Sequence, residues 1–253
     1  MKRTVLAAVC TLAFTVGASA QRLPDNVSPE SYDLKFEPNL ASATFSGDEI
    51  IHVRLRRPAS SITLHSAEIQ FKEATITAGG SLQTASVSSD DKNETATLTV
   101  PNVIPADTAD IHIRYTGILN DKLRGFYLSA TSRRRYAVTQ FEATDARRAF
   151  PSFDEPAYKA VFRITLIVDK GDTAISNARI VSDTPGPGDG KHTLQFSSSP
   201  KMSTYLVAIM VGDFACLEGG ADGIPIRVCA VPEKKDLLSY ALLSAQHLPG
   251  SFE

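Results

Sequence analysis

Strict alternation of apolar and polar residues recurs along this chain, and it limits the possible folds more than any other feature. In residues 32–36, Tyr32, Leu34 and Phe36 alternate with charged residues. The same period of two appears in further runs at 51–55, 96–100, 111–115, 162–168 and 224–230. Successive side chains of a β-strand point to opposite faces, so this period predicts strands with one face in a core and the other in water.

Turn residues separate these runs and indicate how the strands are connected. A further segment, 205–211, is apolar without alternation, which predicts a strand buried on both faces. Many short strands at this spacing favour an all-β fold, and we expect a large antiparallel β-sandwich or saddle. The turn signals are Gly79-Gly80, Pro185-Gly186-Pro187-Gly188, Gly219-Gly220 and Asp222-Gly223.

The pattern changes after Pro232, where apolar residues recur at helical spacing. We therefore expect one C-terminal amphipathic helix over 233–248. Because no second helical layer follows for it to pack on, we interpret residues 233–253 as the first helix of a truncated catalytic domain and 21–232 as a β-domain. The apolar positions of the helix are Leu237, Leu238, Ala241, Leu242, Ala245 and Leu248.

The first twenty residues have the composition of an export signal. Lys2 and Arg3 precede an apolar run at 5–16, and Ala18-Ser19-Ala20 is a cleavage pattern that leaves Gln21 first. A membrane anchor or a buried helix is the alternative, but the run is short for a bilayer. We predict a signal peptide over 1–20, a secreted or periplasmic protein and no membrane span. The formal net charge of −2 gives no reason to expect a nucleic-acid partner.

Two cysteines follow the leader, Cys216 and Cys229. In an exported protein such a pair can form a disulfide, and two buried free thiols are the alternative. A two-residue turn at Asp222-Gly223 would place residues whose numbers sum to 445 opposite each other, including these two cysteines. A turn at Gly219-Gly220 would shift the register and separate the thiols, and the sequence alone leaves both open.

Charged side chains are densest between Thr139 and Lys159. Three interpretations compete for this segment: general acid–base catalysis by paired carboxylates, a structural network of ion pairs, or one carboxylate that binds a cationic ligand. The charge pattern by itself favours the structural network. The residues concerned are Gln140, Glu142, Asp145, Arg147, Arg148, Asp154 and Glu155.

The same segment resembles the hallmark of the aminopeptidase N family of zinc metallopeptidases. The resemblance covers roughly residues 24–248, in order and at natural spacing. It rests on these stretches: Pro29-x-x-Tyr32-Asp33-Leu34, Phe45-Ser46-Gly47, Ile62-Thr63-Leu64-His65, Leu119-Asn120-Asp121, Gly125-Phe126-Tyr127, Gln140-Phe141-Glu142, Asp145-Ala146-Arg147-Arg148, Phe153-Asp154-Glu155-Pro156 and Met202-Ser203-Thr204-Tyr205-Leu206.

The resemblance implies a β-domain that leans on a thermolysin-like catalytic domain and faces peptide substrates. In that arrangement the residues at the positions of Gln140 and Glu142 reach the shared cleft. The carboxylate at Glu142 would bind the α-ammonium group of the substrate, and the amide of Gln140 would orient the same end. The acids and arginines that follow them are expected to hold the segment in shape.

One part of the family pattern is absent from the sequence. Catalysis in the family needs H-E-x-x-H and a further glutamate to bind zinc. None of the five histidines is followed by Glu, and no two of them lie four residues apart. We therefore expect no metal site and no cofactor here, with zinc only in the missing catalytic domain. His65 is interpreted as a hydrogen-bonded strand residue.

Two hypotheses for function follow. The chain is the substrate-anchoring part of a secreted zinc aminopeptidase and inactive alone, or it is a non-catalytic secreted β-sandwich module that binds peptide termini or a protein partner. The unpaired helix favours the first. Arg133-Arg134-Arg135 is interpreted as a solvated loop rather than a site for an anionic partner, and 185–190 as a plain hairpin connection.

Overall fold

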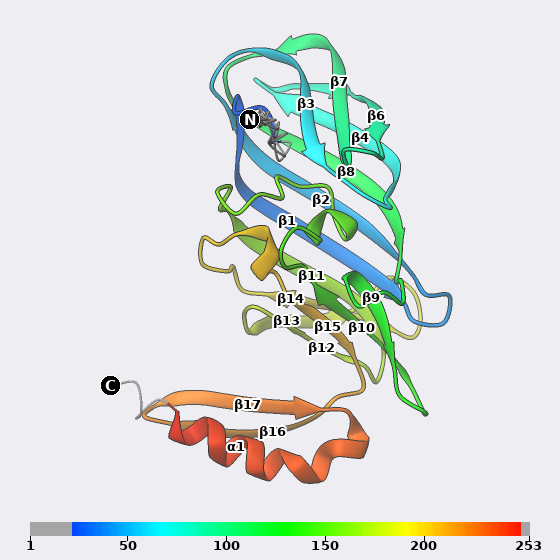
Figure 1. Cartoon of the computed structure of the whole chain (residues 1–253), viewed down its shortest axis with the longest axis vertical. Helices are drawn as coiled ribbons and strands as arrows, with labels where there is room; N and C mark the ends of the chain where they lie inside the picture. Colours follow the sequence, from blue (N-terminus) through cyan, green and yellow to red (C-terminus); the bar gives the residue numbers. More distant parts are fainter. Residues whose placement is uncertain (1–21, 249–253) are drawn as a thin grey trace, which may run out of the picture.

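β-Strands dominate the computed structural model, which describes residues 22–248 (Figure 1). The predicted leader therefore lies outside the described residues. The strands are β1 (Val27–Asn39), β2 (Thr44–Leu55), β3 (Ala59–His65), β4 (Gln70–Ala78), β5 (Ser81–Thr84), β6 (Ser86–Asp90), β7 (Thr95–Ile104), β8 (Asp107–Ile118), β9 (Gly125–Ala130), β10 (Arg135–Gln140), β11 (Val161–Asp169), β12 (Thr173–Ser176), β13 (Ile180–Pro185), β14 (Lys191–Phe196), β15 (Ile209–Gly212), β16 (Ala215–Ala221) and β17 (Ile224–Ala230). The helices are α1 (Leu238–His247) and the 3₁₀ turns η1 (Ala146–Arg148), η2 (Thr204–Leu206) and η3 (Pro232–Leu237).

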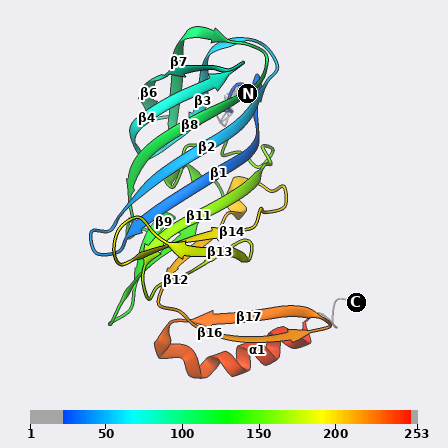
Figure 2. The ribbon, with the colours of Figure 1, turned by 180° about the vertical axis from the view of Figure 1, so that it is seen from behind.

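One large sheet crosses the whole body, and its long strands run diagonally in Figures 1 and 2. Its strand order is β13-β14-β11-β1-β2-β8-β4-β5. The predicted all-β fold is confirmed, and all pairings in this sheet are antiparallel except that of β1 with β11, which is parallel. A three-stranded sheet, β3-β7-β6, and a four-stranded sheet, β12-β15-β10-β9, complete the body.

Aromatic side chains fill the inner face of the large sheet. Gly47 on β2 pairs with Tyr115 on β8, and Phe45 pairs with Gly117, so each ring lies over the glycine opposite it. A Cβ added at either glycine would overlap the facing ring. The absence of a side chain at Gly47 and Gly117 is therefore what lets both rings lie flat in the core.

The acid Glu49 also points into this core. It stands on β2 between Leu34 of β1 and Ile113 of β8, and its side chain is completely buried. Within the described residues neither carboxyl oxygen has a hydrogen-bond partner. Burial, and to a lesser extent the charge of Asp48, raises the pKa of Glu49 well above its usual value. The carboxyl group is therefore expected to stay protonated in the folded protein.

The outer face of the large sheet carries charges of alternating sign in rows across the strands. In one row Arg163 of β11 pairs with Asp33 of β1, which also contacts His52 of β2, and His52 contacts Asp110 of β8. These pairs are partly exposed, so each contributes little to stability, and the face as a whole is suited to water.

The predicted strand at 205–211 is wrong in its bounds. Residues 204–206 form η2, and only β15 (Ile209–Gly212) enters a sheet, where it pairs with β10 and β12. The side chain of Asn177 explains the difference. It donates to the Leu206 carbonyl at 2.7 Å and accepts from the Ala208 N–H at 2.8 Å, so it takes the place of a neighbouring strand.

A hairpin and a helix form a separate layer at the C-terminal end (Figures 1 and 2). The predicted helix begins as the 3₁₀ turn η3 and continues as α1, which packs on β16 and β17. The sequence suggested an unpaired helix, and this prediction is wrong because α1 packs on the hairpin. Leu238 is buried and Leu242 reaches Gly219 on the hairpin, while Gln246 donates to the Gly220 carbonyl at 2.9 Å.

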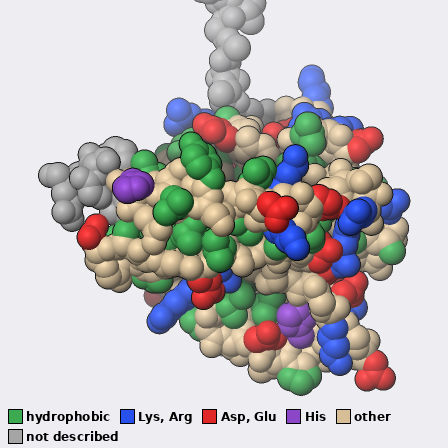
Figure 3. Space-filling model, turned by 90° about the horizontal axis from the view of Figure 1, so that it is seen from below, with side chains coloured by type: hydrophobic (Ala, Val, Ile, Leu, Met, Phe, Trp, Pro, Cys, Tyr) green, Lys and Arg blue, Asp and Glu red, His purple; other side chains and the backbone are tan. Residues whose placement is uncertain are grey.

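The opposite side of this helical segment is also apolar, and it faces outward. Tyr240 is 79% exposed, and Leu237, Leu243 and Leu248 are exposed beside it. Figure 3, which views the molecule from this end, shows hydrophobic side chains gathered on its surface. Large apolar side chains on a helix are normally covered, so the hairpin leaves part of the apolar surface of this helical segment exposed.

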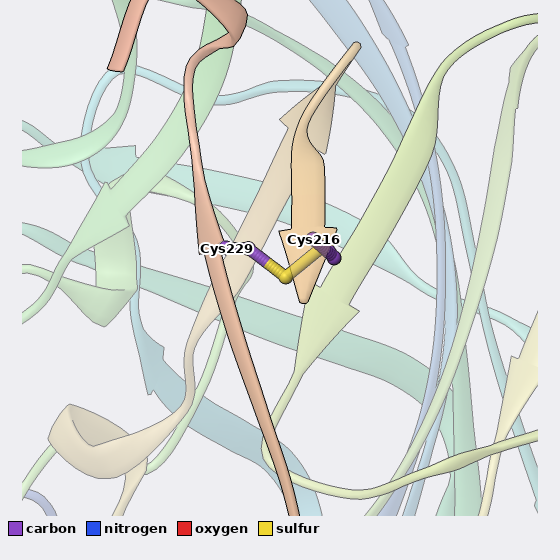
Figure 4. Close-up of a disulfide and its surroundings, with 2 residues drawn as sticks. All are labelled: Cys216 and Cys229. Carbon is purple, nitrogen blue, oxygen red and sulfur yellow. A yellow bond between two sulfur atoms is a disulfide. The ribbon is translucent and has the colours of Figure 1, made fainter. Parts of the chain in front are cut away.

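The hairpin turn decides between the two registers left open by the sequence. Asp222 and Gly223 both have positive φ, 50° and 78°, as a type I′ turn requires. Cys216 therefore pairs with Cys229, their Cα atoms are 4.1 Å apart, and the two form a disulfide (Figure 4). Counting from the turn, this is a non-hydrogen-bonded pair, where the strands approach most closely.

In the arginine run, Arg133 and Arg134 lie on the β9–β10 loop and Arg135 begins β10, and all three contact groups of the chain itself. Arg134 pairs with Asp172 and Asp213, and Arg135 donates to backbone carbonyls of the β1–β2 loop. Arg133 lies 3.9 Å from the Glu233 carboxylate. Residues 186–190 connect β13 to β14, as the hairpin prediction required. Within residues 22–248 no helix is long and apolar enough to cross a membrane.

Candidate functional site

Gln140 and Glu142 lie where β10 ends and the chain turns toward η1. β10 pairs with β9 on one side and β15 on the other, and Gln140, its last residue, stands opposite Gly125. Phe141 is buried, whereas Gln140 and Glu142 are exposed on either side of it. The Glu142 N–H points to Oε1 of Gln140 at 3.5 Å. One buried ring thus fixes the backbone between two exposed polar side chains.

Arg147 fixes the segment that follows Glu142 by binding Asp154. Its Nε donates to Oδ2 of Asp154 at 3.0 Å, and its Nη2 donates to the Asp154 carbonyl at 3.1 Å. The Asp154 carboxylate also accepts from the Thr204 hydroxyl at 2.6 Å, and its side chain is 1% exposed. A buried charge pair with this many hydrogen bonds holds two turns of chain together, since leaving either charge unpaired would be costly.

Arg148 extends the same network to the β3–β4 and β6–β7 loops. Its Nε donates to Asp145 at 2.8 Å and its Nη1 to Glu68 at 2.9 Å, and Nη2 pairs with Glu94. Arg147 also pairs with Glu94, at 3.2 Å. Glu68 and Glu94 were not identified from the sequence, because nothing in their local pattern points to partners more than fifty residues away.

Aromatic contacts complete the support. Phe150 packs edge-on against Phe141, Tyr32 and Phe36, and the Phe153 N–H donates to the Tyr32 hydroxyl at 3.1 Å. The segment is therefore tied to the core of the large sheet as well as to the ion pairs. These contacts are consistent with the structural role expected of Arg147, Arg148, Asp154 and Glu155. Glu155 accepts from the Leu23 N–H at 2.8 Å.

His65 ends β3 beside this network and borders a cavity of about 610 Å³ whose lining also includes Thr144 and Arg147. Its backbone bonds to Ser152 in both directions, as expected of a strand residue. On the side chain, Nδ1 is buried without a hydrogen-bond partner among the described residues. Burial and then the charge of Arg147 lower the pKa of His65 to about 4, so the ring is neutral at physiological pH.

The described residues do not fit a zinc ion. No group of three or more His, Cys, Asp or Glu side chains within 22–248 is arranged to hold a metal. The charged side chains around Arg147 and Arg148 are already saturated by one another.

Comparison with known proteins places this geometry in context. The sequence profile of the peptidase M1 N-terminal domain matches residues 28–206. The chain is 34% identical over 230 residues to a puromycin-sensitive aminopeptidase of Caenorhabditis elegans, covering 88% of this chain and 24% of that protein. It is 39% identical over 242 residues to aminopeptidase 2 of Candida albicans, covering 93% and 26%.

A third relative is shorter. The chain is 33% identical over 240 residues to an aminopeptidase N of Acetobacter pasteurianus, covering 93% of this chain and 66% of that protein. The chain thus spans about a quarter of the length of the first two relatives and about two-thirds of the third.

Proposed function

Because the chain belongs to the family of peptidase M1 N-terminal domains, we propose that it is the part of an aminopeptidase that binds the free α-amino end of a peptide. The relatives named above are aminopeptidases. In this proposal the Glu142 carboxylate accepts hydrogen bonds from the substrate α-ammonium group, and the Gln140 side-chain amide orients the same end.

One observation carries this proposal. The other acids between Thr139 and Lys159 are engaged: Asp145 with Arg148, Asp154 with Arg147, and Glu155 with the Leu23 N–H. Glu142 has no cation or donor on its carboxylate within residues 22–248. It is also exposed, on backbone fixed by the buried Phe141. An unpaired carboxylate on a rigid support is suited to a cationic ligand.

The chemistry of exopeptidase action explains why such an anchor is useful. An enzyme that removes one residue must measure from the charged end of the peptide. A fixed carboxylate does this, because the ammonium group is what distinguishes the first residue from all others. The same contact positions the first peptide bond relative to the hydrolytic group, which raises kcat as well as affinity.

Hydrolysis itself is assigned to residues outside this sequence. The sequence contains no H-E-x-x-H, so we propose that a zinc-binding catalytic domain supplies the metal and the water, and that the chain alone is inactive. The purified 21–253 segment should not hydrolyse an amino-acid anilide. Chelator-sensitive hydrolysis by that segment would contradict the proposal.

The packing of the hairpin suggests where the two domains divide. Since β16 and β17 pack with α1, we place the boundary near Gly212 rather than at 232/233, and we propose that the outer apolar face of α1 contacts the rest of the catalytic domain. The isolated chain should then bind an apolar dye, and Tyr240→Ser with Leu243→Ser should lower that binding. Equal dye binding by the variant would argue against this surface.

Export of the protein also remains a proposal. The leader pattern at 1–20 motivates it, and the Cys216–Cys229 disulfide supports it, since disulfides persist mainly in oxidising compartments. The test is the amino-terminal sequence of the protein recovered from the producing cell. A mature chain that begins at Gln21 is the expected result, and an intact Met1 or a protein retained in the cytoplasm would oppose it.

The anchor is tested by calorimetric titration of the 21–253 segment with short peptides. Binding of a free-amine peptide should exceed that of its N-acetylated form, and Glu142→Gln should abolish the difference. Because Glu142 is exposed here, its contribution is on the order of 0.2–1 kcal/mol in the chain alone, rising to about 2–5 kcal/mol where a catalytic domain excludes water. Glu218→Gln, an exposed acid on β16, is the matched control, and an equal loss in both variants would refute the role of Glu142.

A further inference from the structure

Leu123 has an unfavourable conformation for a leucine. It lies in the loop between β8 and β9, its φ is +56°, and its side chain is 66% exposed. Left-handed backbone disfavours residues with a bulky Cβ substituent, and exposure of an apolar side chain adds no stability. Asparagine or glycine would suit this position better in local terms. A leucine here is therefore not explained by the stability of the loop.

The loop is nevertheless held in one arrangement. Leu119 is buried, and its N–H donates to the Ala43 carbonyl at 2.9 Å. Oδ1 of Asn120 accepts from the Lys122 N–H at 2.7 Å, and its Nδ2 donates to the Arg124 carbonyl at 2.9 Å. These bonds close the loop on both sides of Leu123, so its side chain is presented outward from fixed backbone.

The loop leads directly to the proposed anchor. Gly125, two residues after Leu123, pairs with Gln140, and a Cβ added to it would lie 2.8 Å from Cβ of Arg148. Lys122, one residue before Leu123, shares the Glu68 carboxylate with Arg148. Both ends of the Leu123 turn are thus attached to the elements that present Gln140 and Glu142.

We propose that Leu123 is a specificity-determining residue that contacts the apolar side chain of the amino-terminal residue of a bound peptide. This inference rests on the proposed function, because Glu142 must hold the α-ammonium group for that side chain to be placed. The Glu142 carboxylate would bind the α-ammonium group, which every peptide with a free amino terminus has. A preference among first residues therefore needs a contact with the side chain of that residue. An apolar contact of this kind gives discrimination on the order of tenfold.

The experiment is photolabelling of the 21–253 segment by a short peptide whose first residue is a diazirine analogue of leucine. Labelled residues are located by mass spectrometry. The N-acetylated form of the same peptide is the control, because it measures the labelling that occurs without a free amine. Glu142→Gln and Leu123→Asn are compared with the unchanged chain. Asparagine tolerates positive φ, so Leu123→Asn should fold with an unchanged or higher Tm; Leu123→Ala is the second variant if it does not.

The expected result is amine-dependent labelling within residues 119–124, lost in Glu142→Gln and reduced on the order of tenfold in Leu123→Asn. Labelling that depends on Glu142 but falls outside 119–124, or that Leu123→Asn leaves unchanged, would overturn this inference and leave the anchor intact. Labelling that is independent of the free amine or of Glu142, or no labelling at all, would overturn the anchor and with it the role of Leu123.

Discussion

Replacing Glu49 by glutamine should make the protein more stable at neutral pH. The Glu49 side chain is completely buried, and its carboxyl oxygens have no hydrogen-bond partner among the described residues. Burial raises its pKa well above the usual value, so folding above the pKa of the unfolded glutamate is linked to the uptake of a proton. Glutamine has the same shape and no charge, so it removes this linkage.

The magnitude follows from the pH interval over which the proton must be bound. An unfolded glutamate has a pKa of about 4.3, and each pH unit between that value and the raised folded pKa costs about 1.36 kcal/mol, so the cost at pH 7 is at most about 4 kcal/mol. For a carboxyl group whose folded pKa is raised, the free energy of unfolding is highest below pH about 4.3, where the group is protonated in both states. It falls as the pH rises from there toward the folded pKa. The gain in Glu49→Gln should therefore be close to zero at pH 4 and rise with pH to at most about 4 kcal/mol at pH 7.

The assay is urea unfolding of the unchanged chain and of Glu49→Gln between pH 4 and pH 8. The difference between the two proteins is the relevant quantity, because acids with lowered pKa, such as Asp33 and Asp48, also change stability with pH in both proteins. A difference that does not vary with pH, or a variant less stable at pH 7, would show that Glu49 is charged or hydrogen-bonded in the folded protein.

Three further predictions concern the scaffold. Asp154→Asn should lower the free energy of unfolding by about 3 kcal/mol. This is the low end of the range for a broken buried ion pair, because Glu94 still contacts Arg147. A urea titration that finds a loss of less than about 1 kcal/mol would oppose this. Gly47→Ala should lose about 1–3 kcal/mol, since the new methyl group overlaps the Tyr115 ring, and an unchanged Tm would be the contrary result. Thiol titration of the unfolded, unreduced 21–253 segment should find no free cysteine, whereas two free thiols would mean that the hairpin disulfide does not form.

Much of the fold was accessible from local patterns. Alternation identified the strands because a period of two is a direct consequence of strand geometry, and Asp222-Gly223 predicted the hairpin because both residues accept positive φ. Where side chains far away in sequence replace local bonds, the prediction failed. Asn177 bonds to the backbone at 206 and 208, and the predicted strand at 205–211 is shortened accordingly.

In the candidate site, too, the sequence predicted some features and the structure supplied others. The motif resemblance pointed to Gln140 and Glu142 as the anchor, which is still a proposal. The structure showed which acids of this segment form ion pairs and which does not. Asp145 and Asp154 are paired with arginines, whereas Glu142 is not. No sequence pattern could make that distinction, because it depends on which side chains meet.

The sequence by itself determined the all-β class and the family, because each rests on local patterns or on motifs in a fixed order. Only the tertiary structure decided that Glu49 is buried without a partner, that Glu68 and Glu94 close the network around Arg148, and that the last helix packs on a hairpin. The physical reason is that burial and charge pairing depend on contacts between distant segments. Those contacts are set by the packing of the whole chain rather than by the pattern of any one segment.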